Sequence, residues 1–386
     1  MLESIENDLT YNNDENTEHK CFSEIYESWD REKRDVYCKE MGIKPYKELN
    51  ITTMTTVGAI SQKIEKLLAF HFIKWTTDET SNIGCIRSLA VLSKNGIVRV
   101  RGSKIKKAFK NCVNIVIDIG KKINMKLSEK KIQITGALTI EDGIKGCDLL
   151  MDNVRYASEM ISKIKNNKDV VGWVLKNLQG LECKRDLIKY NQDNKNYIIR
   201  KNRESDFYIK KLSVCGNFLV DDIARETIPI PPEYDLSFIN YLLFLSSEQT
   251  YYKDLHSKLE YAFCSQNIYN TENSIDVDTV KTVMVNHNYN LGYDVKRSML
   301  DELMSTNSGG FISLYDPGFF AGVKIEKSYL PDFIQNTKKH KKNPKYSFIV
   351  YGSGSVTQSG PNKEKNEIEY INFMTEIKKI EDLIKA

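Results

Sequence analysis

Hydrophobic and polar positions follow the same plan in two distant segments of the chain. Residues 51–60 (ITTMTTVGAI) and 280–287 (VKTVMVNH) both have the β-branched composition of a half-buried strand. In each case a short helical run, hairpin strands and an amphipathic helix follow. We therefore predict two copies of a strand–helix–hairpin–helix unit.

The spacing between matching positions indicates a duplication. Thr282 follows Thr52 by 230 residues, and Gly360 follows Gly136 by 224 residues. An internal repeat of this length predicts one architecture built twice. The 224-residue offset also carries one apolar helix stripe onto another, namely Ile144, Cys147 and Leu150 onto Ile368, Ile371 and Met374.

The remaining elements follow from the same periodicities. Residues 21–42 have the apolar spacing of a helix, whereas residues 1–20 are polar. Asn95-Gly96 predicts a tight hairpin turn. In the first copy we also expect a helix whose apolar stripe is Ile64, Leu67, Leu68 and His71, followed by strands at 113–119, 123–127 and 131–135.

A segment of about 120 residues belongs to neither copy. It is polar and rich in Lys and Asn at first, and after a proline cluster at 229–232 it predicts two helices within 235–264. The predicted organisation is a polar tail and helix (1–47), a first repeat (48–158), a mostly helical insertion (159–278) and a second repeat (279–386).

The composition is that of a globular protein, with 386 residues of which 41% are hydrophobic and 28% charged. No run reaches the roughly 18 apolar residues needed to span a bilayer, and the N-terminus does not resemble a secretory signal. Eight scattered cysteines without a C-x-x-C pair favour reduced thiols and argue against zinc. Since the histidines are isolated and no catalytic motif stands out, we predict no catalytic site, no cofactor and no metal.

Basic residues cluster more than the net charge of +4 suggests. One group lies between residues 99 and 110, and another lies between 338 and 345. Such clusters are typical of phosphate binding, although solvated Lys-rich loops have the same composition.

Two motifs of the second copy resemble the TATA-box-binding protein family. Residues 315–323 (YDPGFFAGV) are similar to its tyrosine-acidic-proline-x-x-phenylalanine-x-glycine motif, and residues 348–360 (FIVYGSGSVTQSG) are similar to its Ser-Gly hairpin. Residues 127–137 (LSEKKIQITGA) show a more worn version in the first copy. The Thr- and Met-containing opening strands and the inserted middle most resemble the divergent versions carried by large cytoplasmic DNA viruses.

The resemblance implies an α+β fold in which two pseudo-symmetric repeats form a curved antiparallel sheet, or saddle, with helices on its convex face. The concave face would lie against the minor groove of DNA, which the family bends by inserting apolar side chains between base steps. Phe320 and Tyr351 match one wedge pair. Leu127 matches one position of the other pair, and Phe109 is the best candidate for its partner.

The resemblance also implies groove-facing and phosphate-contacting positions. Thr52 and Thr282 stand where the family has asparagine, and Met54 and Met284 stand where it has valine, so the usual TATA preference is not expected. Further DNA-binding positions are Lys131, Gln133, Thr135, Thr357 and Ser359. Weaker phosphate contacts are expected from Arg99, Arg101, Lys104, Lys324, Lys338, Lys339, Lys341 and Lys342.

The implied function is that of a DNA-binding transcription initiation factor, which binds and bends AT-rich promoter DNA as a monomer and is not an enzyme. Its other partners would be general initiation factors or a viral RNA polymerase, with no role for a membrane. The viral type implies an intracellular location, in the host cytoplasm (viral factory), the nucleus or the virion. Two alternatives stay open: a saddle-shaped protein–protein scaffold that has lost DNA binding, and a DNA-processing enzyme, because some DNA glycosylases and RNase H-type nucleases carry a domain of this fold.

Overall fold

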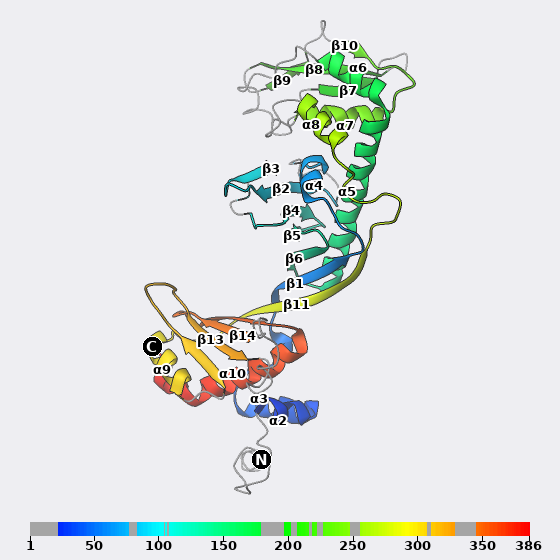
Figure 1. Ribbon diagram of the computed structural model, residues 1–386. Coiled ribbons are helices and arrows are strands. Elements are labelled where there is room, and N and C mark those ends of the chain that lie inside the picture. Colours follow the sequence, from blue (N-terminus) through cyan, green and yellow to red (C-terminus); the bar gives the residue numbers. More distant parts are fainter. Residues whose placement is uncertain are drawn as a thin grey trace. The chain divides into compact units, whose positions relative to one another are not determined.

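The computed structural model describes residues 22–76, 83–103, 105, 108–178, 197–201, 207–215, 218–221, 227–247, 255–306, 310–328 and 345–386. An eleven-stranded antiparallel sheet with helices organises these residues (Figure 1). The expected α+β class and the large antiparallel sheet are therefore confirmed. None of the described helices is long and apolar enough to cross a membrane.

The strands follow the same order outward from two neighbouring strands, β1 and β11. One half of the sheet has the order β1 (Ile51–Ile60), β6 (Lys131–Ala137), β5 (Lys122–Leu127), β4 (Val113–Asp118) and β2 (Ile86–Leu92), with β3 (Val98–Gly102) as an additional edge strand. The other half has the order β11 (Val277–Asn290), β15 (Ser355–Gly360), β14 (Lys345–Val350), β13 (Val323–Ser328) and β12 (Phe311–Leu314).

The chain divides into two compact units. The carboxy-terminal unit comprises residues up to Thr56, Gly136–Leu138 and Thr282–Ala386, and the middle unit comprises Val57–Thr135 and Thr139–Lys281. Strands β1, β6 and β11 therefore contribute residues to both units.

In the middle unit, helices α4 (Lys66–Phe72) and α5 (Ile140–Asn166) cover one face of the strands. The helix α5 begins at a capping box, in which Thr139 and Asp142 bond each other's backbone N–H groups. A Cβ atom at Gly146 would lie 2.7 Å from the Cδ1 atom of Ile123, so a larger residue here would require the Ile123 side chain to move. The helix also runs unbroken through residue 158, where we place the end of the first repeat.

Two residues of the expected apolar stripes face solvent instead. Leu67 on α4 is 49% exposed and Ile144 on α5 is also exposed, whereas Leu68, Cys147 and Leu150 are buried. On α5 the small residues Gly143 and Gly146 take the buried positions next to the sheet. The stripe of α5 is therefore rotated relative to the predicted one, because close packing favours the glycine side of the helix.

The segment between the two copies contains more strand than the sequence predicted. Besides the helices α6 (Lys168–Leu178), α7 (Leu236–Ser247) and α8 (Leu255–Cys264), it forms a second, four-stranded sheet. Its strands are β7 (Tyr197–Lys201), β8 (Phe207–Cys215), β9 (Phe218–Asp221) and β10 (Thr227–Pro229). The expectation of a mostly helical insertion is thus incomplete, because the lysines and asparagines around short apolar runs obscured the strand pattern.

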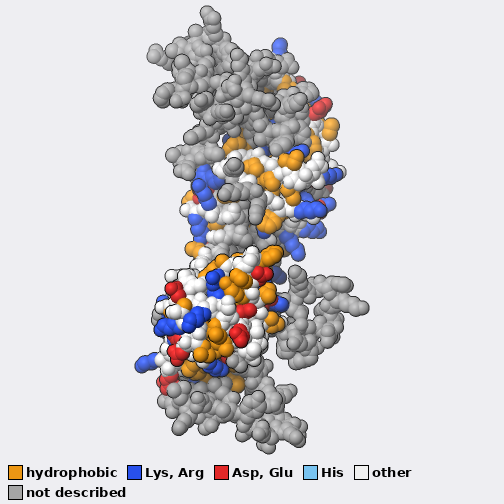
Figure 2. Space-filling model, turned by 90° about the vertical axis from the view of Figure 1, so that its left-hand side faces the viewer, with side chains coloured by type: hydrophobic (Ala, Val, Ile, Leu, Met, Phe, Trp, Pro, Cys, Tyr) orange, Lys and Arg blue, Asp and Glu red, His pale blue; other side chains and the backbone are white. Residues whose placement is uncertain are grey.

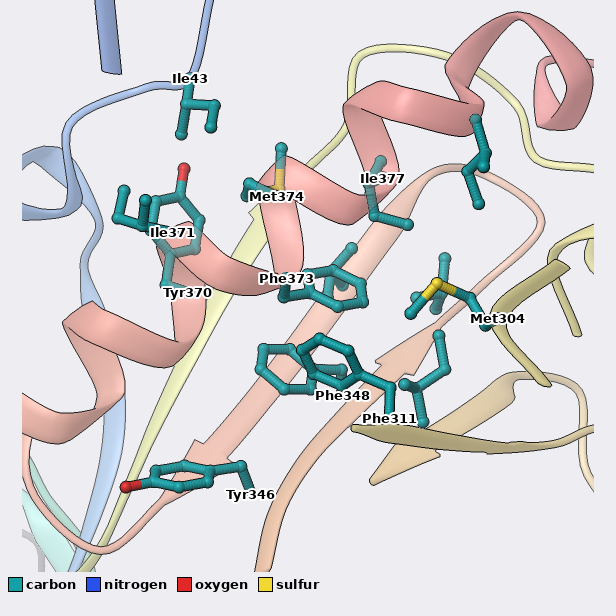
Figure 3. Close-up of a cluster of buried hydrophobic side chains, with 14 of the residues drawn as sticks. Ile43, Met304, Phe311, Tyr346, Phe348, Tyr370, Ile371, Phe373, Met374 and Ile377 are labelled. Carbon is teal, nitrogen blue, oxygen red and sulfur yellow. The ribbon is translucent and has the colours of Figure 1, made fainter. Parts of the chain in front are cut away.

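The core of the carboxy-terminal unit lies between its strands and helices α9 (Arg297–Thr306) and α10 (Lys363–Ile384) (Figure 3). The rings of Phe348 on β14 and Phe373 on α10 are stacked with centroids 4.2 Å apart, and Phe311 on β12 meets both rings edge-on. Aromatic pairs with this geometry stabilise a core beyond their buried area.

Residues near the N-terminus complete this core. The predicted single helix over 21–42 is two helices, α2 (Phe22–Ser28) and α3 (Arg31–Glu40), because Asp30 caps α3 with its side chain. Tyr37 on α3 lies 3.0 Å from the hydroxyl of Thr375 on α10. A short 3-10 helix, η1 (Tyr46–Glu48), then leads into β1.

A buried histidine makes the stability of the carboxy-terminal unit depend on pH. The Nε2 atom of His287 on β11 lies 2.5 Å from the hydroxyl of Tyr46, and the His287 side chain is fully buried. Burial, with a smaller contribution from Lys363, lowers the pKa of His287 from 6.5 to about 4. The unfolded chain therefore binds the additional proton as the pH falls from 6.5 to 4, and the folded state loses stability over that window.

Replacing His287 with Gln should remove this pH dependence while keeping a hydrogen-bond partner for Tyr46. Between pH 7 and pH 4 we expect the free energy of unfolding of the unmodified protein to fall by about 3 kcal/mol more than that of His287→Gln. Urea unfolding at both pH values measures the difference. Parallel losses in the two proteins would contradict a neutral buried histidine.

Candidate nucleic-acid interface

The strands of the carboxy-terminal unit have one face against the helices and one face opposite, which we call the open face. On β15, Val356 and Gln358 are buried on the helix side, so alternation places Thr357 and Ser359 on the open face. On β11, buried Val285 and His287 place Met284 on the open face by the same rule.

The structure brings the predicted residues of the two opening strands together. The hydroxyl of Thr52 donates to the backbone carbonyl of Asn286 at 3.2 Å, and the hydroxyl of Thr282 lies 3.3 Å from the sulfur of Met54. Thr52 and Met284 are exposed, whereas Met54 is buried. Both threonine hydroxyls are therefore used within the protein.

Two polar residues of the open face were missed by the sequence analysis. Asn286 pairs with Ser359 across β11 and β15, and Asn288 pairs with Thr357 in the next row. Asn288 is exposed, and Asn286 and Thr357 are half-buried. Only the structure shows that Val285 and His287 are buried, which places these asparagines on the open face. The comparison with the family directed attention to Thr282 and Met284.

The predicted aromatic pair is present at the edge of this unit. Phe320 and Tyr351 have ring centroids 6.1 Å apart with their planes tilted by 57°. Phe320 is 45% exposed and Tyr351 is half-buried, while the neighbouring Phe319 is almost fully exposed. A side chain at Gly322 would lie 3.1 Å from the Phe320 ring and 3.4 Å from the Tyr351 ring, so the glycine leaves room for the pair.

The hairpin turn fixes the position of Tyr351. Val350 and Val356 form the last strand pair, and the Tyr351 N–H donates to the Ser355 carbonyl at 2.9 Å. Gly354, with a φ of 74°, supplies the left-handed residue of this turn. Tyr351 is thus held just beyond the end of β14.

In the middle unit the predicted residues of β6 also lie on the face opposite the helices, which we likewise call the open face. Lys131, Gln133 and Thr135 alternate on β6 with the buried Ile132 and Ile134, which places all three predicted residues on the open face. On the neighbouring strand β5, Asn124 pairs with Thr135 and Lys126 pairs with Gln133. The Thr135 hydroxyl lies 3.5 Å from the Asn124 carbonyl.

The structure contradicts the assignment of Leu127 as a wedge. Its side chain is fully buried, like Ile123 and Met125 on the same side of β5. Leu127 pairs with Ile132 as Val350 pairs with Val356, so Ser128 is the residue that follows the last pair, as Tyr351 does. The turn after Leu127 is shorter by one residue, and a shift of one residue moves a side chain to the other face of a strand.

Phe109 is accessible to solvent, but it lies against Lys126, whereas the resemblance paired it with Leu127. It is 52% exposed, and the Nζ atom of Lys126 lies 3.6 Å from its ring centroid. The middle unit therefore presents a cation–π pair on its open side, where the carboxy-terminal unit presents two aromatic rings.

Several expected phosphate contacts are placed elsewhere by the structure. Arg101 is only 1% exposed and donates to the carbonyl of Phe70 on α4, so it stabilises the core and is not available to DNA. Arg99 is half-buried on the same side of β3 by alternation. Lys324 is exposed but forms an ion pair with Glu326 at 2.5 Å. The other predicted contacts, Lys104, Lys338, Lys339, Lys341 and Lys342, lie outside the described residues.

Hydrophobic and basic side chains both reach the surface of the described residues (Figure 2). Figure 2 shows one face of the molecule, on which hydrophobic side chains lie among Lys and Arg side chains on the described surface. Across the described ranges, no group of three or more His, Cys, Asp or Glu residues could hold a metal ion.

Comparisons with known proteins add little to this geometry. No family model matches the sequence, and no curated protein matches it. Among solved structures, a TBP from Methanococcus jannaschii is similar over 86% of this chain and 99% of its own, with 12% sequence identity and a TM-score of 0.31.

Proposed function

We propose that this protein binds the minor groove of double-stranded DNA through the open face of its sheet. The observation that carries the proposal is the exposed Phe320–Tyr351 pair, held beyond the ends of its strands with Gly322 beneath it. Two apolar rings at the rim of a helix-backed sheet are suited to insertion between base steps. We also propose that the two repeats form a pseudo-symmetric saddle and that the bound DNA is bent.

The open face also has the side chains that a minor groove requires. The groove floor presents mainly hydrogen-bond acceptors, which small polar side chains can reach. Asn288, Thr357 and Ser359 in one unit and Gln133 in the other provide such groups. Lys122, Lys126 and Lys131 beside them supply positive charge for the phosphates.

The biological role follows from the family resemblance. We propose a transcription initiation factor of viral type that acts as a monomer on AT-rich promoter DNA. Initiation factors or a viral RNA polymerase would be its protein partners, in the host cytoplasm, the nucleus or the virion. The domain organisation into 48–158, 159–278 and 279–386 stays a prediction.

One observation favours the protein–protein scaffold as a second candidate. The edge strand β12 exposes Ile312 and Leu314 on the same face, and Phe319, which follows β12 in the chain, is also exposed. Exposed apolar side chains that lie together are typical of protein interfaces. A scaffold would use this apolar edge to bind a protein partner and would not require DNA.

Salt-dependent binding separates the two candidates. Fluorescence anisotropy of a labelled AT-rich duplex, titrated with the protein at several salt concentrations, measures affinity and its slope with salt. A minor-groove binder should lose affinity steeply, by about 0.9 logarithmic units per phosphate contact for each tenfold rise in salt. No binding to the duplex at low salt would favour the scaffold.

The lysines at 338–342 should account for part of that slope. Replacing Lys338, Lys339, Lys341 and Lys342 with Ser is expected to flatten it by about 0.9 units for each phosphate that the variant no longer neutralises. Lys378→Ser with Lys379→Ser is the matched control, because these lysines lie on α10, on the helix side, where each forms an ion pair. An unchanged slope in the fourfold variant would assign the segment to protein partners or to no role.

A further inference from the structure

Hydrogen-bonding groups on the open face differ in whether the protein already uses them. The hydroxyls of Thr52, Thr282 and Thr135 lie within hydrogen-bonding distance of protein acceptors. Within the described ranges, the side chains of Asn288, Thr357 and Ser359 have no hydrogen-bond partner in the protein. Among these residues, the groups available to a ligand therefore lie on β11 and β15, whereas the hydroxyls of Thr52, Thr282 and Thr135 are already used within the protein.

Asn288 and Thr357 form a single recognition unit. They are direct cross-strand partners in an antiparallel pair, so their Cα atoms are about 5 Å apart. The strand backbones fix both residues, and His287 and Val356, which are fully buried, anchor the opposite side of the same strands. Two adjacent side chains at this spacing can reach the same base pair or two successive ones.

These two polar side chains differ chemically from an apolar protein surface that faces the minor groove. In the minor groove, A·T and T·A pairs present only acceptors, whereas a G·C pair adds the N2 amino donor of guanine. An apolar protein surface offers the guanine amino group no acceptor, and a buried donor without a partner costs free energy. The Asn288 carboxamide oxygen and the Thr357 hydroxyl oxygen can both accept it.

We propose that Asn288 and Thr357 recognise the N2 amino group of guanine in the minor groove. The DNA bound by the carboxy-terminal unit would then contain a G·C pair within an otherwise AT-rich site. This inference rests on the proposed function, because it requires minor-groove binding, but it names a different sequence preference from that of a purely AT-rich element.

Inosine and 2,6-diaminopurine make the amino group testable by itself. Three duplexes share an alternating A·T sequence and differ at one central pair, which is G·C, inosine·C or 2,6-diaminopurine·T. Inosine removes the minor-groove amino group, and diaminopurine adds it to an A·T-like pair. By anisotropy at fixed salt, we expect the G·C and diaminopurine·T duplexes to bind about fivefold more tightly than the inosine·C duplex, as for one additional hydrogen bond.

Variants assign the preference to the two side chains. The double variant Asn288→Leu, Thr357→Val should bind all three duplexes with equal affinity. Thr357→Ser keeps a hydroxyl and should retain the preference. Thr306→Val is the matched control, because its hydroxyl bonds the Glu302 carbonyl within α9 on the helix side. Circular dichroism melting curves establish that each variant is folded.

The outcomes distinguish this inference from the proposed function. Equal binding of the three duplexes by the unmodified protein would overturn the guanine assignment while leaving minor-groove binding intact. A preference that survives in the double variant would also overturn it. Failure of the unmodified protein to bind any of the duplexes would overturn the proposed function, and the inference with it.

Discussion

DNA bound by the Phe320→Ala, Tyr351→Ala double variant should be bent less than DNA bound by the unmodified protein. Opening a base step costs a few kcal/mol in proteins that insert wedges, and the inserted rings must fill the gap to offset that cost. Removing both rings of a pair whose centroids are 6.1 Å apart takes away the filling group. We expect the affinity for a short duplex to fall by about a hundredfold, as for the loss of a few kcal/mol.

Energy transfer between dyes at the two ends of a duplex measures the bend, and anisotropy measures the affinity. Leu383→Ala is the matched control, since this exposed residue of α10 lies on the helix side and its replacement removes apolar surface without altering the aromatic pair. The control should leave the end-to-end distance unchanged. If the double variant bends DNA as the unmodified protein does, or if the unmodified protein does not bend it, the wedge mechanism is wrong.

The bend should also be asymmetric. The carboxy-terminal unit offers two aromatic rings, whereas the middle unit has Ser128 after its last strand pair and places Lys126 over the ring of Phe109. A lysine at this position can contact a phosphate but cannot fill an opened base step. Dyes placed to report on each half of the duplex should therefore show the sharper kink where Phe320 and Tyr351 bind.

Local sequence signals were sufficient where one periodicity dominates. The hairpin at Asn95-Gly96 lies between β2 and β3 as predicted, and the glycine-containing turn after Val350 places Tyr351 beside Phe320. The two turns depend on residues close together in the chain, so turn chemistry and alternation determine them. The pairing of Phe320 with Tyr351 was predicted from the family resemblance, because the two residues are 31 positions apart.

The errors arise where tertiary packing or an alignment decides the outcome. Arg101 lies in a basic cluster of the sequence, yet β3 pairs with β2 and turns its side chain toward α4. Asn288 was overlooked because its exposure depends on pairing with Thr357, which is 69 residues away in the chain. The sequence shows that a residue is charged or polar. It does not show which face of the sheet that residue occupies once strands distant in the chain have paired.

Leu127 shows how a small alignment error changes a predicted role. The family comparison is anchored on the Thr-Gly at residues 135 and 136, and the shorter turn before it shifts Leu127 from the rim to the helix side of β5. Because alternate side chains of a strand face opposite sides, one residue of shift exchanges a wedge for a core residue. The two roles predict opposite results for the same substitution.

Leu127→Ala should therefore destabilise the middle unit and leave the bend of any bound DNA unchanged. A fully buried leucine replaced by alanine loses its transfer free energy and leaves a cavity, which costs about 2–5 kcal/mol. Leu67→Ala is the matched control, because Leu67 belongs to the same unit but is 49% exposed, and its loss should cost no more than about 0.5 kcal/mol. Urea unfolding measures both values, and end-to-end energy transfer measures the bend under conditions in which both variants are folded. A near-neutral stability change combined with a reduced bend would return Leu127 to the wedge position, whereas a large loss of stability with an unchanged bend would establish that the middle unit meets the DNA without an inserted leucine.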